Sequence, residues 1–143
     1  MSDSDVSSVI KGIIISKDTG EHLFDLILDS SLNPQLLSSF AGALTHFGGE
    51  NIGKIEDIII NGLDIQMVIV YKYHLILIAM LTKDVRRDDV KNEANEVLDL
   101  FYSLYETKLK NNELIDVNSL QSFKILLFKQ FNQFYEKLNA KLA

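Results

Sequence analysis

The chain has 143 residues, of which 47% are hydrophobic and 24% are charged, and its formal net charge is −6. These values are ordinary for one globular domain with its own core, and they exclude a disordered chain. The acidic balance argues against a nucleic-acid partner, and the absence of cysteine excludes disulfides, thiolate nucleophiles and cysteine metal ligands.

The amino terminus, MSDSDVSS, is polar and acidic, unlike a secretory or mitochondrial signal. We expect residues 1–7 to form a flexible tail and residues 8–143 to form a single domain. The longest apolar block, residues 65–81, is interrupted by Lys72 and His74 and is rich in β-branched residues, so it predicts strands and not a membrane span. We therefore expect a cytoplasmic protein without a transmembrane segment, for which a peripheral place at membranes would come through partners.

The first ordered part of the chain is predicted to be a hairpin. Residues 9–16 (VIKGIIIS) and 22–28 (HLFDLIL) are apolar runs joined by KDTGE, in which Asp and Gly are turn residues. A helix follows, with Asn33 as its cap and Pro34 at its first position. Its apolar positions recur at helical spacing up to Phe47, and Gly48-Gly49 ends it.

Residues 54–83 are predicted to form a three-stranded antiparallel meander, with strands at about 55–60, 63–71 and 75–82. Asn61-Gly62 suits both centres of a tight turn, and Lys72-Tyr73-His74 gives the second reversal. The runs are apolar on both faces, so the sheet has to be covered on both faces.

Two helices close the chain. The first is predicted over residues 84–112, with one apolar stripe that includes Phe101, Leu104 and Leu109. The second runs to about Leu142 and is capped by Asn118 or Ser119, with Gln121 at the reciprocal position if Asn118 is the cap. A second apolar line (Ile125, Phe128, Tyr135, Leu142) indicates packing against the preceding helix or, as the alternative, a partner.

The chain shows no arrangement typical of catalysis, metal binding or cofactor binding. The three histidines fall in three different elements and form no metal-ligand spacing. The carboxylates of residues 88–99 fit a solvated helix face, and no phosphate-binding loop or GxSxG elbow occurs. We therefore expect no enzyme, no cofactor and no metal site.

Taken together, the elements have the order ββαβββαα. This order, with the opening IKGIIISKDTGEHLFDLIL, the helix NPQLLSSFAGALTHFGGE, the meander IEDIIINGLDIQMVIVYKYHLILIAML and two closing helices, resembles the longin domains of the longin/roadblock, SNARE-like group, in the style of small prokaryotic-type longin-like proteins. Roadblock domains begin with a helix for which this chain has no room, which favours longin. The resemblance implies an α+β fold: a three-layer α/β/α sandwich on a five-stranded antiparallel sheet.

The resemblance also implies a function. Longin-like domains dimerise with themselves or with another longin or roadblock protein, and they dock small Ras-like GTPases, in some cases as exchange-factor subunits. A trafficking or polarity role follows. The weakly charged face of the first helix and the adjoining sheet edge are then the expected partner surface: Gln35, Ser38, Ser39, Gly42, Ala43, His46, Glu56 and Ile58.

Two other interpretations remain open at this point. The same helix face is also compatible with an uncharged solvated surface that binds nothing. A small-molecule sensor domain of similar size and fold is the alternative function, and it requires polar side chains directed into a pocket, whereas these strands are almost uniformly apolar.

Overall fold

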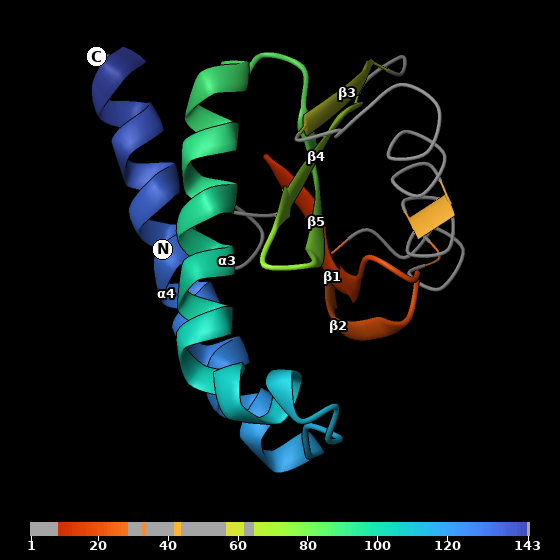
Figure 1. Ribbon diagram of the computed structural model, residues 1–143. Coiled ribbons are helices and arrows are strands. Elements are labelled where there is room, and N and C mark those ends of the chain that lie inside the picture. Colours follow the sequence, from red (N-terminus) through yellow and green to blue (C-terminus); the bar gives the residue numbers. More distant parts are fainter. Residues whose placement is uncertain (1–8, 29–32, 34–41, 44–56, 62–64, 143) are drawn as a thin grey trace.

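The computed structural model describes residues 9–28, 33, 42–43, 57–61 and 65–142 (Figure 1). In chain order the elements are β1 (Ile10–Lys17), β2 (His22–Ile27), β3 (Asp57–Asn61), β4 (Ile65–Lys72), β5 (Leu75–Thr82), α3 (Arg87–Lys110) and α4 (Val117–Leu142). Gly42 and Ala43 are helical, and we call this pair the helix fragment. Every strand overlaps the range predicted for it, and β5 coincides with its prediction.

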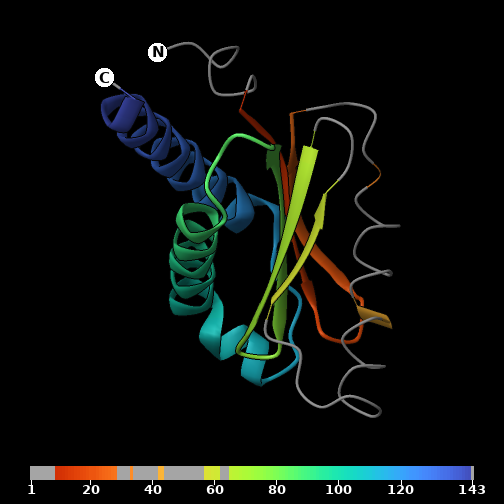
Figure 2. The same cartoon turned by 90° about the horizontal axis from the view of Figure 1, so that it is seen from above.

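The five strands form one sheet in the order β2-β1-β5-β4-β3, and all neighbouring pairs are antiparallel. β1 lies beside β5, so the amino-terminal hairpin and the later meander are joined along this pair. β2 and β3 are the two edge strands. α3 and α4 cover one face of the sheet, and the helix fragment lies on the opposite side (Figure 2).

The turns follow different rules. Gly20 has a φ of 94° in the β1–β2 turn, as expected of glycine. Tyr73 and His74 form the two-residue β4–β5 turn with φ values of 60° and 59°, the left-handed pair that matches the twist of a sheet. Asn61 was predicted at a turn centre, and this is wrong: it is the last residue of β3 and pairs with Gln66. The ladder extends further than turn chemistry alone indicates, and Gly62 lies outside the described residues.

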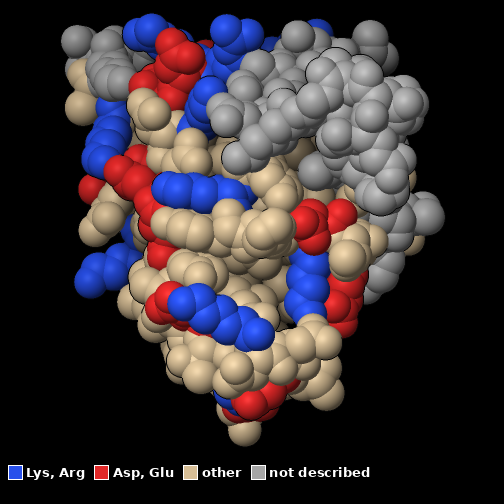
Figure 3. Space-filling view, in the orientation of Figure 1, with Lys and Arg blue, Asp and Glu red and all other residues tan. Residues whose placement is uncertain are grey.

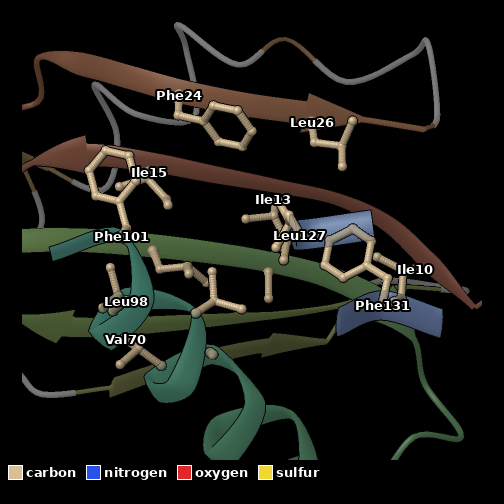
Figure 4. Packing of buried hydrophobic residues seen from close by; sticks show 14 of the residues in the cluster. Ile10, Ile13, Ile15, Phe24, Leu26, Val70, Leu98, Phe101, Leu127 and Phe131 are labelled. Carbon is tan, nitrogen blue, oxygen red and sulfur yellow. The ribbon is translucent and has the colours of Figure 1, made fainter. Parts of the chain in front are cut away.

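The main core fills the space between the sheet and the two helices. Figure 4 shows side chains from β1, β2, α3 and α4 directed toward one another there, among them Ile13, Phe24, Phe101 and Leu127. Phe123 is fully buried at its centre, with ring centroids 4.9 Å from Phe24 and 5.1 Å from Phe101. The stripes of both helices therefore meet the sheet directly.

The other face of the sheet is also buried. A second cluster of apolar side chains occupies the alternate strand positions there: Ile14, Ile69, Ile76, Ile78 and Met80. This explains why the strands lack hydrophobic–polar alternation, since both of their faces are removed from water.

The spacing of apolar residues in the two closing helices predicts more buried side chains than the structure shows. Leu104 belongs to the predicted stripe of α3 but is 48% exposed. Phe128 packs on the main core as expected, whereas Ile125 is 71% exposed, so the prediction of intramolecular packing is wrong for Ile125. A helix stripe predicts direction, but whether a flanking side chain reaches a neighbour depends on the crossing of the two helices.

The start of α4 also differs from the prediction. The helix begins at Val117, and the Asp116 carboxylate accepts a hydrogen bond of 2.7 Å from the Ser119 N–H. Asp116 is therefore the cap, and the prediction of Asn118 or Ser119 is wrong. A carboxylate is an equally good capping group and adds a favourable charge at the positive end of the helix.

The α+β class, the antiparallel sheet and the two closing helices are confirmed. The first helix, predicted over residues 34–47, lies outside the described residues except for the helix fragment. The three-layer sandwich, which depends on that helix, therefore stays a prediction.

Candidate functional site

The structure describes three of the eight residues that the sequence proposes for a partner surface. Gly42 is buried and Ala43 is exposed, both in the helix fragment. Ile58 lies in the edge strand β3, where it pairs with Ile69. The remaining five (Gln35, Ser38, Ser39, His46 and Glu56) lie outside the described residues.

Gly42 packs on the β1–β2 turn. A Cβ atom at this position would be 2.5 Å from the Gly20 Cα, a distance that real Cβ contacts essentially never show, and 3.1 Å from the Thr19 carbonyl carbon. Gly42 is therefore directed toward the protein, because only glycine allows the two backbones to approach this closely. Ala43, the next residue, is the one that faces outward.

β3 provides the second part of the surface. Among the described strands it is an edge strand with β4 as its one neighbour, so no other described strand pairs with its outer backbone groups. Such an edge can pair with a strand of another chain. Its position agrees with the sequence-based expectation that Ile58 lies at a sheet edge.

A polar cluster that sequence reasoning missed joins two turns at one end of the sheet. The Asp18 N–H donates to the His74 carbonyl oxygen at 3.0 Å, and the His74 Nδ1 lies 3.0 Å from the Asp18 Oδ2. The Tyr71 hydroxyl donates to the same oxygen at 3.2 Å. Burial, and next the Asp18 charge, raises the pKa of Tyr71. We call these three residues the turn cluster.

A second group attaches the β4–β5 turn to α3. The Lys72 Nζ and the Tyr73 hydroxyl donate to one oxygen of Asp99 at 2.7 and 2.8 Å. The rings of Tyr73 and Tyr102 are stacked, with centroids 4.1 Å apart and planes 6° from parallel. We call these four residues the aromatic clasp.

Within the aromatic clasp, Lys72 and Asp99 stabilise each other's charged forms. The hydrogen bond from Lys72, and then that from Tyr73, holds the pKa of Asp99 below its usual value. The same contacts raise the pKa of Lys72 and of Tyr73, chiefly through their hydrogen bonds to Asp99. The group is partly exposed, so it holds the turn in place without a strong net contribution to stability.

The other charged candidates have structural partners. Gln130 of α4 donates to Glu93 at 3.2 Å and to Glu96 at 3.4 Å, and Lys137 lies 3.5 Å from Glu93. His22 pairs with Asp25 at 2.7 Å. Within the part of the chain that the structure describes, no group of three or more His, Asp or Glu side chains could hold a metal ion.

Two hollows bear on the sensor alternative. One lies between the sheet and the helices, is lined by apolar side chains including Ile10, Val97 and Phe134, and has about 30 Å³ of space, far below the volume of a metabolite site. The other, of about 330 Å³, lies between the β1–β2 turn and the α3–α4 connection. Lys17 at its wall is already paired with Asn112 and Glu21, at 2.7 and 3.0 Å.

The face formed by α3 and part of α4 carries acidic and basic side chains side by side, without a region of one sign (Figure 3). Such a surface lacks the basic stripe that a nucleic-acid site requires. No helix of the described residues is long and apolar enough to cross a membrane.

Comparisons with known proteins support the fold. No protein-family model and no curated protein matches the chain. The crystal structure of a roadblock/LC7 domain from Streptomyces avermitilis is similar at a TM-score of 0.56 and 12% sequence identity, over 73% of this chain and 92% of that one. Myxococcus xanthus MglB is similar at a TM-score of 0.55 and 14% identity, over 71% of this chain and 89% of that one.

The chain has the roadblock/longin fold. At these identities the likeness shows the fold alone. These two structures do not separate longin from roadblock, and residues 1–8, where a leading helix would lie, are outside the described residues.

Turn geometry was the one signal that could have revealed the turn cluster and the aromatic clasp. In a two-residue hairpin turn without glycine or asparagine, the left-handed residues carry a backbone cost that side-chain contacts can offset. Tyr73 and His74 are such residues, and both have partners in other elements. The identity of those partners is not visible from spacing.

Proposed function

We propose that this protein is a non-catalytic interaction module that dimerises and docks a small Ras-like GTPase, as a regulator or exchange-factor subunit. The observation that carries the proposal is the roadblock/longin fold, shared with a roadblock/LC7 domain and with MglB over more than two thirds of the chain. Modules of this group, as the sequence resemblance implies, act by presenting surfaces to partner proteins.

The proposed dimer surface combines the outer side of the first helix with the β3 edge. Ala43 is its described helical member, because Gly42 packs inward. β3 of one protomer would pair with β3 of the other about a two-fold axis, so that each edge satisfies the other. Gln35, Ser38, Ser39 and His46 remain the proposed neighbours of Ala43, and Glu56 and Ile58 those of the edge.

The paired helices would then form the docking surface for the GTPase. If nucleotide exchange occurs, the module would favour a conformation of the GTPase switch segments that has lost affinity for nucleotide. We assign no residue to that step. A trafficking or polarity role belongs to the same proposal and follows the partner.

The experiment that tests the dimer is the molar mass in solution by multi-angle light scattering for three chains: wild type, Ala43→Glu and Ala140→Glu. Ala140 is exposed near the end of α4 and provides the same substitution at a distant site. We expect a wild-type dimer, a monomeric Ala43→Glu and a dimeric Ala140→Glu. A wild-type monomer, or a dimer unaffected by Ala43→Glu, would contradict the proposed surface.

Docking is tested with Ras-like GTPases of the source organism, loaded with GDP or with a non-hydrolysable GTP analogue. Binding is measured by calorimetry, and exchange is measured from the release of a fluorescent GDP. We expect binding to at least one GTPase with a preference for one nucleotide state, and its weakening by Ala43→Glu but not by Ala140→Glu. Equal binding by both variants would place the docking surface elsewhere.

A further inference from the structure

The turn cluster and the helix fragment contact the same short segment. Asp18 lies at the beginning of the β1–β2 turn. Its backbone N–H and its carboxylate both form hydrogen bonds with His74. Gly20, two residues later, supports Gly42 at backbone contact distance. The β1–β2 turn therefore connects the β4–β5 turn with the element proposed to form the partner surface.

The backbone of His74 is held in place by the turn. Its left-handed φ of 59° follows that of Tyr73, which the aromatic clasp attaches to α3. Because the turn cannot rotate without breaking that clasp, the backbone that carries the imidazole is held in place beside Asp18. A change in the strength of the Asp18–His74 contact therefore acts mainly on the β1–β2 turn.

The contact between Gly20 and Gly42 leaves little tolerance. The two backbones are so close that a single added carbon atom would lie 2.5 Å from the Gly20 Cα. Close-packed contacts of this kind transmit small displacements instead of absorbing them. Movement of the β1–β2 turn is therefore felt at Gly42.

We propose that Asp18 and His74 form a pH-sensitive latch. Protonation of His74 fixes the β1–β2 turn and thereby strengthens the contact between this turn and the helix fragment. The latch rests on the proposed function in one respect: the helix fragment carries Ala43 of the proposed dimer surface, so lowering the pH would strengthen the dimer. The contact itself is independent of any partner.

The chemistry of the latch is simple. Neutral imidazole contributes an ordinary hydrogen bond to the carboxylate, whereas imidazolium contributes a charge-assisted one, which is stronger. The titratable groups that face the imidazole, among the described residues, are Asp18 from the β1–β2 turn and Tyr71 from β4. Because the His74 side chain is 86% exposed, solvent screens the pair, and we expect a two- to fivefold effect, roughly that of an exposed ion pair.

Nuclear magnetic resonance tests the latch directly on the full chain. The chain has three histidines and seven glycines, so the imidazole signals and the Gly20 and Gly42 amide signals can be assigned and followed between about pH 5 and 8. We expect both amides to shift with the same midpoint as the His74 ring. Amides that stay constant, or that follow His22 or His46, would overturn the proposal.

Two variants and a matched control complete this test. His74→Asn keeps a donor and tolerates the left-handed turn but does not titrate, and Asp18→Asn removes the carboxylate. Both should abolish the pH-dependent shift of the Gly42 amide. His22→Gln, which removes the other histidine paired with a carboxylate, should leave it unchanged. Retention of the shift in His74→Asn would contradict the latch.

The dimer readout separates the two proposals. Sedimentation at several concentrations gives the dimer dissociation constant at pH 6 and pH 8, with a two- to fivefold tighter dimer expected at pH 6 at roughly the strength of an exposed ion pair. In His74→Asn the two constants should be equal. A chain that is monomeric at both pH values but retains the Gly42 shift would refute the dimer and leave the latch standing.

Discussion

The side-chain amide of Gln66 donates a hydrogen bond of 2.7 Å to the carbonyl oxygen of Val85. The same nitrogen donates to the Thr82 carbonyl oxygen at 2.9 Å, and Gln66 is 4% exposed. One buried side chain of β4 thus satisfies two backbone acceptors in the connection between β5 and α3. The chain leaves the sheet and enters the helix at this point.

Replacement of Gln66 by leucine should lower the free energy of unfolding by about 1–3 kcal/mol, because two carbonyl groups each lose a donor, that of Val85 in a buried place. Urea denaturation followed by circular dichroism measures the change. Gln133→Leu, at an exposed position of α4, is the matched control and should change stability by less than about 0.5 kcal/mol. Equal effects of the two changes would show that the Gln66 bonds have no special role.

Gly42→Ala should destabilise the protein, although the same change in an exposed helix is ordinarily favourable by up to about 1 kcal/mol. The reason is the backbone of Gly20, which a Cβ atom would approach to 2.5 Å. We expect a loss of about 1–3 kcal/mol, as for an overpacked core. Thermal and urea unfolding measure it, with Ala43→Ser as a neutral exposed control. An increase in stability would mean that the two backbones separate freely.

Asp99→Asn should lower stability at neutral pH by about 0.5–1 kcal/mol, the range of a partly exposed ion pair. The pKa of Asp99 is lower in the folded than in the unfolded chain, so its contribution is complete above its usual value of 3.8 and disappears as the pH falls through the folded value. The wild type and the variant should therefore differ constantly from about pH 5 to 8 and converge in acid. Urea midpoints at a series of pH values check this. Glu113→Gln, in the exposed α3–α4 connection, should show no such pattern.

Phe123→Ala should cost about 3–5 kcal/mol, because the fully buried ring leaves a cavity among Phe24, Phe101 and Tyr105. Ile125→Ala, two residues further along α4, removes a mostly exposed side chain and should cost less than about 0.5 kcal/mol. Chemical denaturation of both variants gives the contrast. A large loss from Ile125→Ala would indicate that its exposed side chain is covered in the assembled protein.

The described strands were readable because β-branched runs and turn residues act locally. The positions of α3 and α4 were readable for the same reason, as amphipathic stripes. The cap at Asp116 and the exposure of Ile125 were not, because each depends on which of several adequate residues the packing selects. Tertiary contacts, and not local preference, decide between such alternatives.

The candidate surface was only partly readable. Spacing placed Gly42 and Ala43 together on one helix, but their opposite directions follow from contact with Gly20, which is distant in sequence. The Asp18–His74 contact joins residues 56 positions apart and has no spacing signature. The sequence does show that the Tyr73–His74 turn has no glycine. This points to contacts made by the two side chains only once the turn is known to be left-handed.

The placement of β1 between β2 and β5 has a consequence for how the chain folds. β1 and β2 are neighbours in sequence, and so are β3, β4 and β5, so each group is a local unit that can form without the other. The β1–β5 pair is the long-range step, since Ile15 and Leu77 must meet across more than sixty intervening positions. Pairings of high sequence separation are the slow ones in folding. We expect the pairing of β1 with β5, and not the formation of either unit, to set the folding rate. Substitutions at the β1–β5 pair should therefore slow refolding more than substitutions within the β1–β2 hairpin.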